Sequence, residues 1–365
     1  MNFWQNLPKP VVGLAPMDGV TDAPFRFITA KHGKPDVIIT EFVSVDGIYH
    51  GSSRLFEDFL YHEVEKPVVA QIYGKDPKLF YLAAKVACTL GFDGIDINMG
   101  CPSRSVAARG SGAALINTPD LARQIITATK KGVNDWVSDG FVGLPQKTVA
   151  ATNNTKMKLR DLGIVFDDDR KQIPVSVKTR IGLREVVITE WVNNLLEAGA
   201  ANITMHGRTL KQTYTGNADW NSIAEGAQIV RGFNKGKEAE DRVTYIGNGD
   251  ITNPNVAVER IAQSGVDGVL IGRAAMGNPW IFRYKNQIRD LKKNIVLEDI
   301  SVTERVEMAI EHSRVFERVK QLSPFVQMRK HLGWYMKSFP GASEVRMKLM
   351  QTNSSKDVVK LLRAL

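Results

Sequence analysis

The segment from Asp93 to Ser103 (DGIDINMGCPS) holds the clearest chemistry in this sequence. Its alternating apolar residues predict a short buried strand that ends at Gly100. Cys101 follows at once, and Arg104 and Arg109 come soon after. Cations near a thiol tune its pKa and favour the binding of polyanions. The segment therefore indicates a functional cysteine; the alternative is a cysteine that only packs in the core, as most free cysteines do.

Eight short runs predict buried parallel strands that alternate with helical patterns. The strands are expected at Val11–Ala15, Asp36–Phe42, Pro67–Tyr73, Gly94–Met99, Pro174–Arg180, Asn202–His206, Val243–Asn248 and Gly268–Gly272. Helices are expected at Ala23–His32, Pro77–Leu90, Pro119–Lys131, Glu185–Ala198, Trp220–Arg231 and Pro254–Ser264. This alternation predicts an α/β fold, a closed TIM (β/α)8 barrel. A doubly wound open sheet is the alternative, but no Gly-x-Gly-x-x-Gly loop follows an early strand.

Polar residues stand where most of these strands end, and barrel enzymes carry their chemistry at that end. The set comprises Ala15 to Gly19, Gln71, Asn98 with Cys101, Lys178 with Arg180, His206 to Arg208, Asn248 to Asp250, and Gly272 with Arg273. So many polar strand ends at one end of the barrel predict an active site there.

Two features of this set indicate an anionic ligand. The last two strands end in glycine turns, where such barrels commonly bind a phosphate. Glycines expose backbone N–H groups, and Arg273 adds a fork of donors. Lys178 lies inside an otherwise apolar strand, so its charge needs an anionic partner. The N1–C2=O edge of a flavin, which gains negative charge on reduction, is a candidate.

Length and composition narrow the class of protein. The 365 residues exceed the ~250 of one barrel, so a smaller second domain is expected. The 43% hydrophobic and 24% charged residues are typical of a soluble globular protein. Two cysteines exclude a disulfide framework and fit a reducing cytoplasm, and Cys88 is expected to be inert core. The sequence suggests no signal peptide, and no segment approaches the ~20 apolar residues of a membrane span.

The positive charge is concentrated at the end of the chain. The net charge is +9, and residues 301–365 hold twelve Lys or Arg against six Asp or Glu. The spacing of Val306, Ala309, Ile310 and Val319 predicts a helix with one buried face. Concentrated basicity of this kind indicates an anionic partner, with nucleic acid first and an acidic membrane surface second. A solvated helical face is the alternative.

Taken together, these motifs resemble the tRNA-dihydrouridine synthases, FMN-dependent enzymes that reduce specific uridines in tRNA, and the resemblance covers nearly the whole chain. It depends on residues 15–26 (APMDGVTDAPFR), 98–103 (NMGCPS), 112–115 (GAAL), 177–182 (VKTRIG), 206–209 (HGRT), 212–216, 247–250 (GNGD) and 272–274 (GRA). Residues 329–335 (RKHLGWY) resemble the bacterial B-type branch.

The resemblance implies a role for each matching residue. Cys101 is expected to be the general acid that protonates the uracil ring. A tightly but non-covalently bound FMN is expected to contact Ala15, Pro16, Met17, Gln71, Lys178, His206, Asn248, Gly249, Asp250, Gly272 and Arg273. Substrate contacts are expected from Asn98, Arg104, Arg180, Arg208, Arg329 and Lys330. The expected reductant is NADPH and the expected partner is tRNA; no metal, membrane or obligate protein partner is expected.

The resemblance also implies two domains, an FMN-binding barrel over residues 1–299 and a helical tRNA-binding domain over residues 300–365. Residues 133–172 depart from the family pattern and are expected to be an insertion, turn-rich and on the face opposite the βα-loops. Two other functions remain open: a flavin barrel dehydrogenase acting on a free pyrimidine such as dihydroorotate, and a non-catalytic RNA-binding or chaperone protein on a barrel scaffold.

Overall fold

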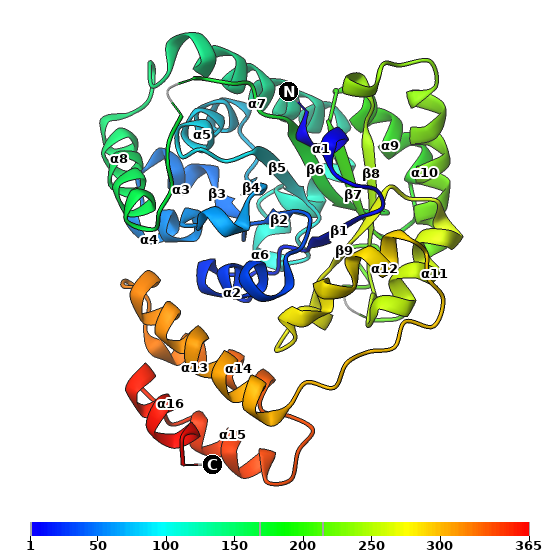
Figure 1. Ribbon diagram of the computed structural model, residues 1–365. Coiled ribbons are helices and arrows are strands. Elements are labelled where there is room, and N and C mark those ends of the chain that lie inside the picture. The colour runs from blue at the N-terminus through cyan, green and yellow to red at the C-terminus, as the bar shows by residue number, and fades with distance from the viewer. Residues whose placement is uncertain (1, 168, 214, 365) are drawn as a thin grey trace.

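The computed structural model describes residues 2–167, 169–213 and 215–364, without the side chains of residues 104 and 105. A barrel of parallel strands lies inside a ring of helices (Figure 1). The strands are β1 (Val11–Leu14), β2 (Ile38–Ile39), β3 (Val43–Ser44), β4 (Val68–Tyr73), β5 (Gly94–Met99), β6 (Val175–Arg180), β7 (Asn202–His206), β8 (Thr244–Asn248) and β9 (Gly268–Ile271). Their order is β2-β1-β9-β8-β7-β6-β5-β4-β3, and the pairing of β2 with β4 closes the barrel. The predicted TIM barrel is confirmed.

The six predicted helices are all present. They are α2 (Ala23–Gly33), α5 (Pro77–Thr89), α7 (Pro119–Asp139), α9 (Ile188–Glu197), α10 (Trp220–Asn234) and α11 (Pro254–Ser264). Shorter helices are α1 (Phe3–Asn6), α3 (Val45–Tyr49), α4 (Ser53–Phe56), α6 (Arg104–Ala107) and α12 (Lys285–Arg289). The 3-10 turns are η1 (Glu57–Phe59), η2 (Glu63–Glu65), η3 (Gly112–Asn117), η4 (Ala239–Asp241), η5 (Arg273–Ala275) and η6 (Pro279–Tyr284). Several helices begin with a capping side chain followed by proline, as Asp76 and Asn253 do for α5 and α11.

One predicted strand is wrong in its extent. Residues 36–42 were expected to form a single strand, but only Ile38 and Ile39 pair as β2, and Val43 and Ser44 pair separately as β3. Thr40 explains the interruption. Its hydroxyl accepts a hydrogen bond from the backbone N–H of Gln71 at 2.9 Å, in place of the backbone carbonyl that would accept it in a continuous strand pair. The chain can therefore turn after Thr40 at the carboxyl end of the barrel.

The barrel has two apolar layers. Inside the strands, Val11, Val69, Ile246 and Leu270 form a cluster with Trp4 of α1, which closes the amino end of the barrel. A second and larger cluster lies between the strands and the surrounding helices. Side chains on alternate strand positions thus point to different layers. The polar strand ends are left at the carboxyl end.

The segment 133–172 is more helical than its composition suggested. The predicted turn-rich stretch is wrong, because α7 continues to Asp139 and α8 (Gln146–Asp161) follows. Packing extends α7: the Trp136 indole donates to Thr89 Oγ1 at 2.8 Å. Helix α8 lies against α3 and α4 on the outer wall (Figure 1), and Thr148 bonds the carbonyl of Tyr49 at 2.8 Å. Helix α8 therefore lies along the outer wall of the barrel, and the predicted position of the segment opposite the βα-loops stays a prediction.

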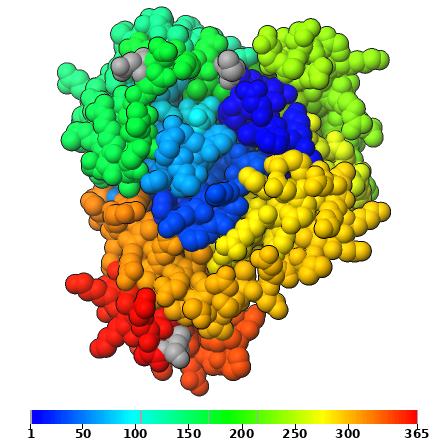
Figure 2. Space-filling model, in the orientation of Figure 1, coloured from blue at the N-terminus to red at the C-terminus, as the bar shows by residue number. Residues whose placement is uncertain are grey.

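The end of the chain is helical, as predicted. Residues 300–365 contain α13 (Val302–Val319), η7 (Phe325–Met328), α14 (Arg329–Tyr335), α15 (Ala342–Leu349) and α16 (Ser355–Leu362). Figure 2 shows these helices, orange to red, seated against the first part of the chain in blue. Lys320 pairs with Asp58 at 2.9 Å, and the ring of Phe25 in α2 lies 5.6 Å from that of His331. The helices therefore pack on the barrel through α2 and η1.

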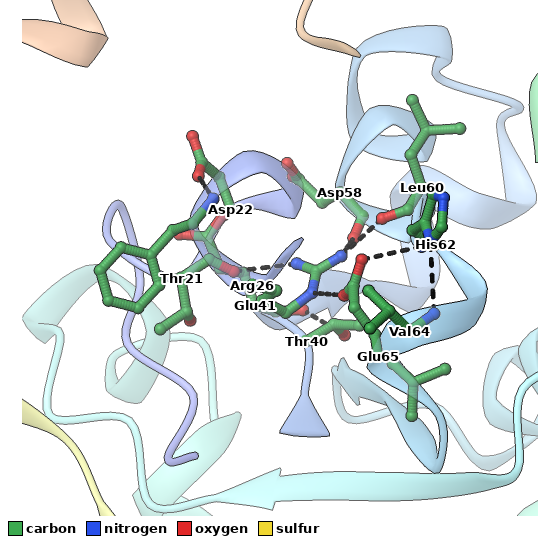
Figure 3. A network of polar contacts seen from close by, with 12 residues as sticks. Thr21, Asp22, Arg26, Thr40, Glu41, Asp58, Leu60, His62, Val64 and Glu65 are labelled. Carbon is green, nitrogen blue, oxygen red and sulfur yellow. Dashed lines mark hydrogen bonds and ion pairs between the residues drawn. The ribbon is translucent and has the colours of Figure 1, made fainter. Parts of the chain in front are cut away.

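A buried arginine supports this junction (Figure 3). Arg26 of α2 is fully buried and pairs with Glu65 at 3.0 Å. Its guanidinium also donates to the carbonyls of Thr21 at 2.9 Å and Leu60 at 2.6 Å. Burial raises the pKa of Glu65 to about 7, although Arg26 opposes the rise. Arg26 thus ties the loop that follows β1 to the turns η1 and η2.

Within the described parts of the chain, no helix has the length and apolar character needed to cross a membrane.

Candidate active site

The carboxyl ends of the strands bring the predicted site residues together. Strand register places Asn98 beside Lys178, and His206 beside Asn248. Gln71 on β4 lies opposite Asp96 on β5. Because residues two apart on a strand point to the same face, Asp96 and Asn98 both point into the barrel. The site is therefore built from strands far apart in sequence.

The loop that carries Cys101 is fixed by its neighbours. Asn98 Oδ1 accepts hydrogen bonds from the backbone N–H groups of Cys101 at 2.8 Å and Gly100 at 3.1 Å. Arg180 Nε donates to the carbonyl of Gly100 at 2.6 Å. Gly112 has φ of 62°, and a Cβ there would lie 3.2 Å from Cys101 Cβ. These contacts give the thiol a defined position at the end of β5.

The Cys101 thiol is suited to hold a proton. The residue is 7% exposed, and burial raises the pKa of the thiol above its usual value. The charge of Asp18 adds to the rise, while Arg180 and Lys178 act against it. The thiol is therefore protonated near neutral pH, as a general acid must be before it acts.

Lys178 provides a cation at the centre of the site. Loss of hydration, followed by the charge of Arg180, lowers the pKa of Lys178 to about 8. Among the residues that the structure describes, its ammonium has no hydrogen-bond or ion-pair partner. A half-buried lysine without a partner fits an anionic ligand group.

A charged cluster follows β7, β8 and β9. Asp250 accepts hydrogen bonds from Arg208 at 2.7 Å and from Arg273 at 2.7 Å. Burial acts to raise the pKa of Asp250, but the N–H of Ala218 and the two arginines lower it below its usual range. Burial and the neighbouring cations lower the pKa of His206 to about 2, so this imidazole is neutral. Arg273 remains largely exposed and can still reach a phosphate.

The loop after β1 lies between the barrel and the last helices. Ala15 bonds the carbonyl of Ile271 at 2.9 Å, and the N–H of Met17 donates to Thr21 Oγ1 at 2.9 Å. Pro16 and Met17 are half-buried beside Gly272, where a Cβ would lie 3.3 Å from Met17 Sδ. The Lys330 ammonium of α14 donates to the carbonyl of Gly19. The last helices therefore touch the rim of the site.

Two other residues that were predicted to contact the cofactor have structural roles. Asn248 donates to the carbonyl of Leu270 at 2.8 Å, which ties β8 to β9. Gly249 has φ of 131°, and a Cβ there would lie 2.6 Å from Ala218 Cβ. Glycine is required here because the loop after β7 passes so close. Contacts of these residues with FMN stay predictions.

Several residues predicted to contact substrate have internal partners. Arg180 and Arg208 are buried, and Arg208 Nη2 donates to the carbonyl of Gly216 at 2.6 Å in addition to Asp250. Arg329 donates to the carbonyl of Thr352 at 2.8 Å and to Asn353 at 2.7 Å. These contacts position loops and helices. Lys330 is exposed at the rim, and the side chain of Arg104 lies outside the described residues. Substrate contacts by all five stay predictions.

Sequence reasoning missed Asp96. This carboxylate is fully buried and accepts hydrogen bonds from Gln71 Nε2 at 2.7 Å and Ser176 Oγ at 2.8 Å. The alternation that places Asn98 inside the barrel also places Asp96 there, so its face could have been predicted. Its partners depend on strand register and could not.

Comparison with known proteins identifies the family. The sequence model described as "Dihydrouridine synthase (Dus)" matches residues 13–139 and 168–365, which leaves 140–167 outside the match. The "Probable tRNA-dihydrouridine synthase 2" of Bacillus subtilis (strain 168) is 31% identical over 99% of this chain and 95% of that protein. The "Probable tRNA-dihydrouridine synthase" of Staphylococcus aureus (strain COL) is also 31% identical, over 99% of this chain and 94% of that protein.

A solved structure supports the fold alone. A 2-naphthoyl-CoA reductase complex matches with a TM-score of 0.50 at 8% identity, over 76% of this chain and 50% of that chain. A parallel barrel with a protonated thiol, a lysine and arginines at the strand ends defines an α/β-barrel enzyme. This chain belongs to the dihydrouridine synthase family. The predicted family and enzymatic nature are confirmed, and the B-type branch stays a prediction.

Proposed function

We propose that this protein reduces specific uridines in tRNA to 5,6-dihydrouridine, with FMN as its bound cofactor and NADPH as the reductant. The observation that carries the proposal is the buried Cys101 thiol, whose pKa burial raises, beside Asn98 and Lys178 in a chain of the dihydrouridine synthase family. A cytoplasmic location fits this function, since tRNA is the substrate.

The donor set at the carboxyl end fits FMN. Within the described part of the chain the Lys178 ammonium has no hydrogen-bond or ion-pair partner, so it is available to the flavin edge that gains negative charge on reduction. Arg273 is exposed at the end of β9, where barrels of this kind commonly bind a phosphate. Pro16, Met17 and Gln71 would contact the ring system. Bound FMN would supply the hydride that C6 of uracil accepts.

Cys101 would supply the proton. When C6 of uracil accepts a hydride, the C5=C6 π bond breaks and its electron pair is left at C5. A new C5–H bond forms as the S–H bond of Cys101 breaks, and the thiolate then recovers a proton from solvent. Asn98 would orient the uracil ring against the thiol.

The tRNA chain must deliver its uridine to this end of the barrel. An enzyme that acts on a base within a folded nucleic acid draws that base out of its stack. The last helices meet the rim of the site through Lys330, and further exposed lysines lie at positions 337, 348, 356 and 360. We propose that these helices, residues 300–365, supply most of the affinity for tRNA.

The proposed tRNA surface predicts a salt-dependent loss of affinity. Replacing Lys330, Lys337 and Lys348 together by alanine should weaken tRNA binding. The slope of log affinity against log salt concentration should become shallower by roughly two to three units, because each phosphate contact that is removed no longer releases its counterion. The control replaces Lys235, Lys292 and Lys293, which are exposed and lie outside residues 300–365. Filter binding between low and moderate salt gives both slopes. Equal slopes for the two triple variants would contradict the assignment.

Two experiments test the activity. Purified protein should show the absorbance of non-covalently bound FMN, and with NADPH it should convert uridine to dihydrouridine in tRNA from a strain lacking the gene. Mapping dihydrouridine in that tRNA identifies the positions. Activity on dihydroorotate or free uracil, but not on tRNA, would instead support the free-pyrimidine dehydrogenase. A protein that binds RNA but neither FMN nor NADPH would support a non-catalytic role.

A further inference from the structure

A chain of hydrogen bonds runs from the interior of the barrel to the loop of Cys101. Gln71 Nε2 donates to Asp96 Oδ2 at 2.7 Å, and Asn98 Nδ2 donates to Gln71 Oε1 at 2.9 Å. Asn98 Oδ1 then accepts the N–H of Cys101 at 2.8 Å. Asp96 and Gln71 are fully buried, and Asn98 is 7% exposed. The chain therefore links a carboxylate in the barrel to the backbone of the proton donor.

The two ends of this chain fix the direction of both amides. An ionised carboxylate can only accept hydrogen bonds, and a backbone N–H can only donate. With Asp96 at one end, the NH2 group of Gln71 must face the carboxylate and its oxygen must face Asn98. The NH2 group of Asn98 then faces Gln71, which leaves Oδ1 for the N–H groups of the loop. Neither amide can rotate without setting donor against donor.

We propose that Asp96 is a positioning residue, whose carboxylate sets the orientation of Gln71 and Asn98 and through them the place of the Cys101 thiol. The proposal rests on the proposed function in one respect: the oriented Asn98 is the group that would meet the uracil ring. Asp96 itself touches neither substrate nor thiol.

Ser176 provides a control that distinguishes the positioning role of Asp96 from the mere presence of a buried charge. Its hydroxyl lies 2.8 Å from Asp96 Oδ1 and 3.1 Å from the carbonyl of Ile95, so it binds the carboxylate oxygen that Gln71 does not use. Loss of Ser176 would leave the bond from Gln71 to Asp96 intact. Asparagine at position 96 would keep an acceptor for Gln71 and place its NH2 group toward Ser176, whose hydroxyl can then bond Ile95.

The experiment compares Asp96→Ala, Asp96→Asn and Ser176→Ala in the full-length protein carrying its cofactor as purified. In a Cys88→Ala background, the pH profile of iodoacetamide alkylation reports the access and pKa of the Cys101 thiol without any substrate. In Asp96→Ala the Cys101 thiol should be alkylated roughly tenfold faster, because Asn98 Oδ1 is no longer held in place as the acceptor for the loop. Asp96→Asn and Ser176→Ala should stay close to the parent.

Activity gives the second readout. Asp96→Ala should slow oxidation of the reduced enzyme by tRNA by roughly ten- to a hundredfold in its maximal rate. Reduction of the enzyme by NADPH should slow much less, because Gln71 is only one of several residues that would contact the flavin. Asp96→Asn should restore tRNA reduction, since it restores the acceptor. A merely structural residue would lower both half-reactions together and would not distinguish alanine from asparagine.

Three results would overturn the proposal. Unchanged thiol reactivity in Asp96→Ala would show that the chain of amides does not position Cys101. An asparagine variant as impaired as the alanine variant would assign the effect to the charge that Asp96 presents to Lys178. If the alanine variant does not fold, Asp96→Val takes its place in both measurements, because valine also lacks an acceptor but fills more of the space. If neither variant folds, Asp96 serves the fold alone and the proposal is wrong. An inactive parent enzyme would count against the proposed function, while the alkylation result would still decide the role of Asp96.

Discussion

Replacing Cys101 by alanine should abolish most tRNA reduction while leaving reduction of the bound cofactor by NADPH intact. The thiol is the proton donor in the proposed reaction, and a positioned general acid contributes typically ~10²–10⁴-fold in rate. The loss should appear in the reaction of the reduced enzyme with tRNA, measured in a single turnover by the return of flavin absorbance. Affinity for tRNA should change little, because the thiol is only 7% exposed and lies at the end of β5.

Two further cysteine variants sharpen this expectation. Cys101→Ser should be nearly as impaired as Cys101→Ala, since a hydroxyl is a far weaker acid than a thiol. Cys88→Ala removes the other cysteine, which is buried in α5, and should leave both half-reactions close to normal. Because burial raises the pKa of Cys101, loss of the thiol proton should not lower tRNA reduction by the parent between pH 7 and the usual thiol pKa. An equal loss of both half-reactions in Cys101→Ala would instead make the residue structural.

Replacing Arg26 by leucine should destabilise the protein by about 3–5 kcal/mol, because it leaves the buried Glu65 carboxylate without its partner. The side chains of this pair are 0% and 1% exposed, so water cannot replace the guanidinium. The carbonyls of Thr21 and Leu60 also lose their donor. Denaturant unfolding followed by circular dichroism measures the loss. The loop after β1 should loosen in the same variant, which would weaken retention of the proposed FMN.

An exposed ion pair gives the matched control for Arg26. Arg363 pairs with Glu307 at 3.3 Å, with side chains 60% and 56% exposed, and Arg363→Leu should cost less than about 1 kcal/mol. The double variant Arg26→Leu/Glu65→Leu should recover part of the stability, because it leaves no buried charge. A loss for Arg26→Leu as small as that of Arg363→Leu would contradict a structural role for the buried pair.

The Arg26 variant should also depend on pH in a defined direction. Glu65 has a folded-state pKa of about 7, above its ordinary 4.5, so the fold favours the protonated form. Stability from such a group is fully present below pH 4.5 and is lost as pH rises through about 7. Loss of Arg26 removes an interaction that lowers this pKa. The penalty of Arg26→Leu should therefore be smaller at pH 5 than at pH 8.

Much of the fold follows from local patterns in the sequence. The alternation of apolar residues defines which face of β5 points inward, and Asp76 and Asn253 before prolines define where α5 and α11 begin. Because the barrel places all carboxyl strand ends together, the predicted positions of Cys101 and Lys178 agree with the structure. Helix α8 was missed because its apolar residues are sparse and its packing against α3 and α4 comes from distant sequence.

The partners of charged and polar side chains were decided by the tertiary structure alone. The sequence places an arginine at position 208 but does not reveal that Asp250, in the loop after the next strand, pairs with it. The sequence likewise places a carboxylate at position 96 but does not reveal that its hydrogen-bond partner is Gln71, which lies 25 residues away. Periodicity encodes the face on which a side chain lies, because that depends on the residue's own strand or helix. Pairing depends on register and barrel closure, which many distant contacts set together.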